Sequence, residues 1–131
     1  MTRRSHAALI LVIVTALVVA CGPGQTPEPP EDVAHYTPEG PGGDAAQLSG
    51  LLERDDGCVY VVDPVSSMRT IPAFPNDRAI RWDDEVLQVG SRALTLGGTV
   101  DLAGGEGGAG LAGMFIPESC DPSAPVFIVS F

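Results

Sequence analysis

The 131-residue sequence contains no Lys, and its seven Arg face 17 Asp and Glu residues, which gives a formal net charge of −10. Nucleic-acid binding depends on Lys and Arg side chains that neutralise phosphates, and docking to anionic lipid depends on the same charges. The composition therefore argues against a nucleic-acid partner and against electrostatic docking to lipid. The length allows one small domain.

Residues suited to acyl-transfer catalysis are also scarce, because a Ser or Cys nucleophile needs a His or Lys base. The two His residues are His6, near the N-terminus, and His35, in a stretch rich in Pro and Gly. Aromatic residues make up 5% of the chain and include a single Trp, so few large side chains are present to line a deep cleft. We therefore expect a protein that is not an enzyme and that needs no cofactor.

The N-terminus has the pattern of a secretory signal peptide, a positive start followed by an apolar run. Arg3 and Arg4 supply the charge, and the 14 residues from Ala7 to Ala20 contain Thr15 as their only polar member. A helix that spans a membrane needs about 20 apolar residues, so this run is too short. The arginine pair also partly matches the twin-arginine export signal, so export by that pathway is an alternative to general secretory export.

This apolar run ends in Leu17-Val18-Val19-Ala20-Cys21-Gly22, with a small residue directly before Cys. The segment resembles the lipobox of bacterial lipoproteins. The resemblance implies cleavage before Cys21 and attachment of lipid, including an acyl chain such as palmitate, to that residue. Two or more acyl chains hold a protein firmly on a membrane. The expected location is therefore the extracytoplasmic side of the cell membrane; ordinary secretion, with Cys21 there by chance, is the alternative.

With Cys21 assigned to lipid, Cys58 and Cys120 remain. Two cysteines left in a small exported domain usually pair, because thiols oxidise outside the cytoplasm. We therefore predict one disulfide, which the chain-entropy model values at roughly 4 kcal/mol. Two buried free thiols are the alternative. A zinc site is not expected, because two Cys without a nearby His do not complete a ligand set.

The chain divides into three predicted segments: a lipoprotein signal peptide (1–20), a lipidated Cys followed by a tether (21–47), and a β domain (48–131). Gly and Pro supply 11 of the 26 residues in 22–47, and its scattered apolar residues could not fold alone. An extended tether of this length would reach up to roughly 80 Å. His35 and Tyr36 are expected to be solvent-exposed within it.

Short apolar runs separated by turn residues predict an all-β domain. The predicted strands are 47–54, 58–62, 68–74, 79–82, 86–89, 93–96, 99–103, 114–116 and 126–131. A domain of about 84 residues is short for a β-sandwich, whereas a closed barrel removes exposed strand edges with few strands. We therefore expect a small barrel of five to six strands, resembling the oligonucleotide fold, with a small β-sandwich as the alternative. Pro72 suits a strand edge or end, and the apolar run at 126–131 suits a central strand or the barrel seam.

The run Gly57-Cys58-Val59-Tyr60-Val61, the glycine-rich stretch after Val100-Asp101-Leu102 and the late Cys120 resemble uncharacterised small β domains of bacterial lipoproteins. This resemblance implies no particular activity. Gly105, Gly107 and Gly110 formally match the dinucleotide-binding pattern G-x-G-x-x-G, but that site needs a helix, and none is predicted after them. A loop between strands is expected there.

Two acidic clusters are weak candidates for calcium binding, because hard cations take six to eight oxygen ligands. They are Asp55 with Asp56, and Asp83 with Asp84 and Glu85. Neither cluster has the alternating spacing of a calcium loop, and charge runs usually lie on the surface. The sequence thus favours an envelope lipoprotein with a non-catalytic binding or structural module for an envelope protein or wall ligand. A carboxylate- or calcium-dependent envelope enzyme is the alternative.

Overall fold

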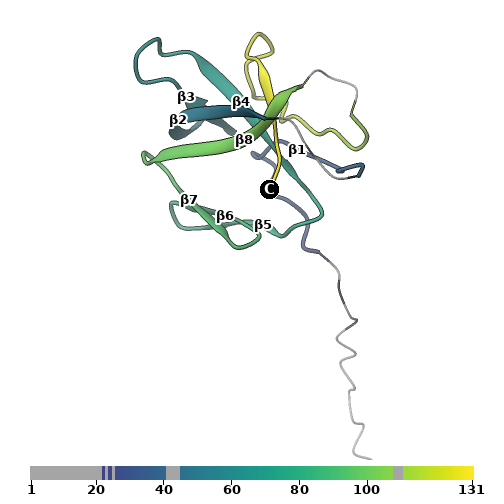
Figure 1. Ribbon diagram of the computed structural model, residues 1–131. Coiled ribbons are helices and arrows are strands. Elements are labelled where there is room, and N and C mark those ends of the chain that lie inside the picture. The colour runs from purple at the N-terminus through teal and green to yellow at the C-terminus, as the bar shows by residue number, and fades with distance from the viewer. Residues whose placement is uncertain (1–21, 23, 25, 41–44, 108–110) are drawn as a thin grey trace, which may run out of the picture.

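The computed structural model describes residues 22, 24, 26–40, 45–107 and 111–131, and these residues form nine strands and no helix (Figure 1). Within these ranges, no segment is therefore a helix able to span a membrane. The strands are β1 (His35–Tyr36), β2 (Ala46–Asp55), β3 (Cys58–Val62), β4 (Arg69–Pro75), β5 (Ile80–Asp83), β6 (Val86–Val89), β7 (Arg92–Thr95), β8 (Thr99–Gly107) and β9 (Val126–Val129). The predicted all-β class is confirmed.

Five of these strands pair into a closed ring. Strand β2 pairs with β3 and β8, β3 with β4, and β8 with β9, all antiparallel, while β4 and β9 pair in parallel and close the ring. A closed five-stranded ring is the arrangement expected of a small barrel of the oligonucleotide-fold type. Strand β9 lies between β4 and β8, so the apolar C-terminal run is at the closing seam, as its composition predicts.

Pro72 lies inside β4, and the position explains why a proline is tolerated there. The N–H of Ile71 donates to the carbonyl of Pro125, 2.8 Å away, on the side of β9. Successive backbone groups alternate sides along a strand, so the nitrogen of Pro72 faces the side of β3. The β3–β4 pairing ends at Thr70. The missing N–H of Pro72 therefore removes no ladder hydrogen bond.

A second, three-stranded antiparallel sheet is formed by β5, β6 and β7, which lie below the ring in Figure 1. Its alternate residues Ile80, Leu87, Val89 and Leu94 belong to the same buried cluster as the inward-facing residues of the ring. The residues of the ring and N-terminal segment in that cluster are Val33, Leu52, Val59, Val61, Phe74, Val100, Leu102, Phe127 and Val129. The small sheet therefore completes the main core.

The other face of β3 and β4 is buried as well, against a second apolar cluster. We call residues 111–125 the covering segment, because its Met114, Ile116 and Ala124 pack on this cluster. The buried residues of the cluster are Ala34, Tyr36, Cys58, Tyr60, Ile71, Ala73 and Cys120. Burial on both faces explains the almost uninterrupted apolar sequence of β3.

The N-terminal segment contradicts the prediction of a solvated tether through residue 47. Val33 and Ala34 are buried, and the Tyr36 side chain is 8% exposed. Strand β1 pairs in parallel with β4, and the N–H of Phe74 donates to the carbonyl of Ala34 at 3.0 Å. A segment with few apolar residues cannot fold alone, but here the barrel supplies the surface on which it packs. The domain therefore includes residues 31–37, and β2 begins at Ala46.

Two other predictions are wrong. The glycine-rich loop is in part a strand, because β8 continues to Gly107 and pairs with β9; residues 108–110 lie outside the described ranges. A Cβ atom on Gly104 would collide with the carbonyl oxygen of Ile128, and one on Gly107 with the Ile128 side chain. The glycines thus permit a close approach of two strands. The predicted strand at 114–116 forms only an isolated bridge between Phe115 and His35.

Candidate binding groove

A groove of about 450 Å³ lies between the N-terminal segment and the covering segment. Its lining residues come from two parts of the chain far apart in sequence. They are Glu28, Pro29, Glu31 and His35 from the first part, and Phe115, Pro117, Glu118 and Ser119 from the second. The fold brings these two parts together by fastening each of them to the barrel.

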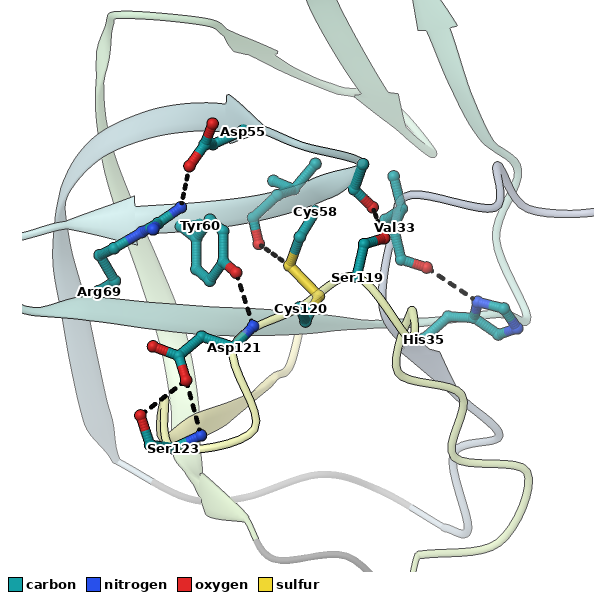
Figure 2. The surroundings of a disulfide bond; sticks show 12 residues. Val33, His35, Asp55, Cys58, Tyr60, Arg69, Ser119, Cys120, Asp121 and Ser123 are labelled. Atoms are coloured by element: carbon teal, nitrogen blue, oxygen red, sulfur yellow. Dashed lines mark hydrogen bonds and ion pairs between the residues drawn. A yellow bond between two sulfur atoms is a disulfide. The ribbon is translucent and has the colours of Figure 1, made fainter.

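The backbones of His35 and Phe115 join the two sides of the groove. The N–H of His35 donates to the carbonyl of Phe115 at 3.0 Å, and the N–H of Phe115 donates to the carbonyl of His35 at 2.8 Å. Their rings stack, with centroids 4.9 Å apart and an angle of 28° between the planes. Nδ1 of His35 lies 3.2 Å from the carbonyl oxygen of Val33, as Figure 2 shows. The pair forms a flat, partly apolar surface in the groove.

The N-terminal side is held by Asp32, a carboxylate that is 8% exposed. The indole N–H of Trp82 donates to its Oδ1 at 3.0 Å, and Nε of Arg54 lies 2.5 Å from its Oδ2. The Arg54 guanidinium also lies over the Trp82 ring, 4.8 Å from its centroid. The N–H of Val33 closes the preceding turn on the carbonyl of Pro30 at 3.1 Å. These contacts fix the chain directly after Glu31.

The covering-segment side is held by the disulfide between Cys58 and Cys120, which Figure 2 shows. The bond joins residues 62 apart in sequence, with Cα atoms 5.1 Å apart, and confirms the predicted pairing. Two hydrogen bonds flank it (Figure 2): the Ser119 hydroxyl donates to the carbonyl of Gly57 at 3.1 Å, and the N–H of Asp121 donates to the hydroxyl of Tyr60 at 2.8 Å. This side of the groove is therefore fastened to β3.

The turn after the disulfide has a carboxylate of its own. The hydroxyl and N–H of Ser123 donate to Oδ1 of Asp121 at 2.7 and 2.9 Å (Figure 2). These hydrogen bonds favour the charged form and lower the pKa of Asp121, with a smaller contribution in the same direction from the Arg69 guanidinium. The turn that follows Cys120 is thus held closed by an ionised side chain.

The groove is acidic and has an apolar surface. Glu28, Glu31 and Glu118 are exposed and contribute three carboxylates, while Pro29, Pro117 and the stacked rings contribute apolar area. Carboxylates attract cations, and a long basic side chain can lay its aliphatic stem on an apolar surface while its charged end stays in water. The arrangement is therefore suited to a ligand that carries amines or guanidinium groups.

The acidic clusters predicted from the sequence lie on two different hairpins. Asp55 and Asp56 are at the β2–β3 turn, where Asp56 (φ 46°) and Gly57 (φ 78°) form the two-residue connection. Asp55 accepts a hydrogen bond from Arg69 at 2.9 Å (Figure 2).

The second cluster, Asp83, Asp84 and Glu85, is exposed at the β5–β6 turn of the smaller sheet. In the described part of the chain, no group of three or more His, Cys, Asp or Glu residues could hold a metal ion. The two clusters are therefore not joined into a calcium site. The candidate lipidation residue, Cys21, lies outside the described ranges.

Sequence reasoning missed the groove, because it assigned Glu28, Glu31 and His35 to the tether and attached no role to Glu118. One signal was present: Val33, Ala34 and Tyr36 place three apolar side chains within four residues of a stretch otherwise dominated by Pro, Gly and acids. Such a cluster indicates packing against something else.

No protein-family model matches the chain, and the searches of curated proteins and of solved structures find no similar protein.

Proposed function

We propose that this chain is a lipid-anchored protein on the extracytoplasmic side of a cell membrane, and that its domain binds a ligand in the groove without catalysing a reaction. The anchor is lipid on Cys21, as the lipobox pattern of residues 17–22 implies. The disulfide between Cys58 and Cys120 supports export, because disulfides persist outside the reducing cytoplasm.

The single observation that carries the binding function is the groove itself. Binding sites are concave and combine apolar area with a few convergent polar groups, and the groove combines prolines and an aromatic ring with carboxylates. Its walls are fixed by a disulfide on one side and by the buried Asp32 carboxylate on the other. A ligand would therefore meet a preformed surface, which lowers the entropic cost of binding.

Binding without catalysis is supported by the contacts of His35 and Ser119, which supply the imidazole and the hydroxyl of the groove lining. The ring of His35 stacks on Phe115, and its Nδ1 faces the carbonyl of Val33. The hydroxyl of Ser119 donates to the carbonyl of Gly57. Both side chains thus have structural contacts that hold the groove together.

The anchor is tested by fractionating bacterial cells that express the full chain or its Cys21→Ala variant. We expect the wild-type chain in the membrane fraction, with an uncleaved precursor accumulating when the lipoprotein signal peptidase is inhibited by globomycin. The variant should be released or remain uncleaved. Equal membrane retention and equal mass of the two chains would rule out the anchor.

The groove is tested in the same cells with a photo-crosslinking amino acid placed at Phe115 or, as a control, at Val65. Both side chains are exposed, at 38% and 93%, but only Phe115 lines the groove. Adducts of defined mass from position 115 and none from position 65 are expected. The same adducts from both positions, or none from position 115, would count against a binding groove.

A further inference from the structure

We infer that the groove binds an extended basic segment, rich in Lys or Arg, of a protein partner embedded in the same membrane. This inference rests on the proposed function, since it takes the lipid on Cys21 as the anchor. It adds the chemical class of the ligand and the place where the ligand must be.

The short distance between anchor and groove is the first argument. The chain is already fixed to the barrel at residues 32–36, through Asp32 and the pairing of β1 with β4. Glu28, which lines the groove, is only seven positions after Cys21 in the sequence. An extended chain covers at most about 3.6 Å per residue, so the groove lies within about 25 Å of the lipidated residue. A tether as long as the sequence predicted would have allowed roughly three times that distance.

The charge and shape of the groove are the second argument. Three exposed residues with carboxylates, Glu28, Glu31 and Glu118, line the same groove as the stacked rings of His35 and Phe115. Lys and Arg side chains place their stems on apolar surface, and a guanidinium also stacks on aromatic rings. A Lys or Arg side chain is therefore complementary to the groove, because its charged end is attracted by the carboxylates and its stem can pack on the apolar surface.

The same charges favour a protein, and not the lipid bilayer, as the ligand of the groove. The chain from Cys21 onward carries five Arg against 17 Asp and Glu residues, three of them lining the groove, and it therefore repels anionic headgroups. A basic segment that emerges from a neighbouring membrane protein lies within the reach of the groove and is attracted by it. Electrostatic complementarity of this kind raises the association rate and selects the partner.

The ligand class is tested with the full chain, purified from membranes in a neutral detergent, and a short oligolysine peptide. The groove variant carries Glu28→Gln, Glu31→Gln and Glu118→Gln. The control variant carries Glu53→Gln, Glu85→Gln and Glu106→Gln, which change the net charge equally at exposed positions outside the groove. We expect the groove variant to bind about tenfold more weakly and the control to stay within about twofold of wild type.

Equal weakening of the two variants would overturn the inference, because it would show attraction by net charge alone. Absence of oligolysine binding, or stronger binding of anionic vesicles or neutral glycans, would also overturn it. The lipid on Cys21 is measured in the same preparation by mass. Failure of peptide binding with an intact anchor therefore refutes this inference alone, whereas a missing lipid refutes the proposed function.

The position of the partner is tested by inserting a long Gly/Ser spacer after Gly22 in the chain that carries the photo-crosslinker at Phe115. Lengthening a flexible tether about fourfold lowers the effective concentration roughly tenfold. We expect crosslinking in cells to fall by about that factor, with oligolysine affinity of the purified chain unchanged. Undiminished crosslinking would contradict a partner held close to the membrane.

Discussion

The hydroxyl of Tyr36 donates a hydrogen bond of 2.7 Å to the carbonyl of Val129, across 93 residues of sequence. This contact joins β1 to β9, the strand that closes the ring. The segment that leads from the predicted lipid anchor is thereby fixed to the end of the domain. Because this segment belongs to the domain, the proposed tether between the lipid anchor and the groove is shorter than the sequence predicts.

Replacing Tyr36 with Phe should destabilise the domain by about 1 kcal/mol, because the buried Val129 carbonyl loses its donor. Burial, and secondarily the charge of Asp77, raises the pKa of Tyr36 above its ordinary value of 10.0. A raised pKa contributes stability that is present below pH 10 and is lost as the pH rises through the folded-state value. Urea unfolding at neutral and alkaline pH should therefore show a smaller alkaline loss in the variant. An unchanged alkaline loss would contradict the contact.

The packing of the N-terminal segment is tested by replacing Val33, which is fully buried, with Ala. We expect a loss of about 2 kcal/mol from the free energy of unfolding, through lost burial and the cavity left behind. The matched control is Val65→Ala, at a side chain that is 93% exposed, and its effect should be within about 0.5 kcal/mol. Equal stability of the two variants in denaturant would place the segment outside the core.

Replacing Cys58 and Cys120 together with Ser should lower stability by about 4 kcal/mol, because the bond closes a loop of 62 residues. The covering segment should lose its hold on β3, so chymotrypsin should cut it at Leu111, Met114 or Phe115 faster than it cuts the rest of the domain. The measurements are urea unfolding and timed proteolysis. Free thiols at both positions in the oxidised wild-type protein would refute the disulfide.

Replacing Gly104 with Ala should cost about 1–3 kcal/mol, because the new Cβ would collide with the backbone of Ile128 in β9. The same change at Gly22, where a Cβ would have no neighbour within 4 Å, should leave stability unchanged. Thermal unfolding of the two variants compares them directly. Similar transition temperatures for both variants would contradict the close β8–β9 approach.

The strands that are predictable from the sequence are those with a continuous apolar run and a recognisable turn beside it. The run at 58–62 forms β3 with the predicted bounds, and the Asp56-Gly57 turn sets the register of β2 against it. Strand β1 could not be predicted, because it has two residues and is stable only where β4 supplies its hydrogen bonds. The extension of β8 through glycines depends on contact with Ile128, which no local pattern reveals.

The groove could not be predicted for a similar reason. Glu31 and Glu118 are 87 residues apart in sequence, and they line one surface only because a disulfide and a buried carboxylate fasten their segments to the same barrel. The disulfide was predictable from compartment and cysteine count. The role of Asp32 was not, because a buried acid looks the same in sequence as the solvated acids around it.

The intact mass of the protein extracted from membranes tests the proposed lipid anchor most directly. We expect a chain that begins at Cys21 and carries a diacylglyceryl group with an additional acyl chain. A chain that retains residues 1–20, or one cleaved elsewhere without added lipid, would contradict it.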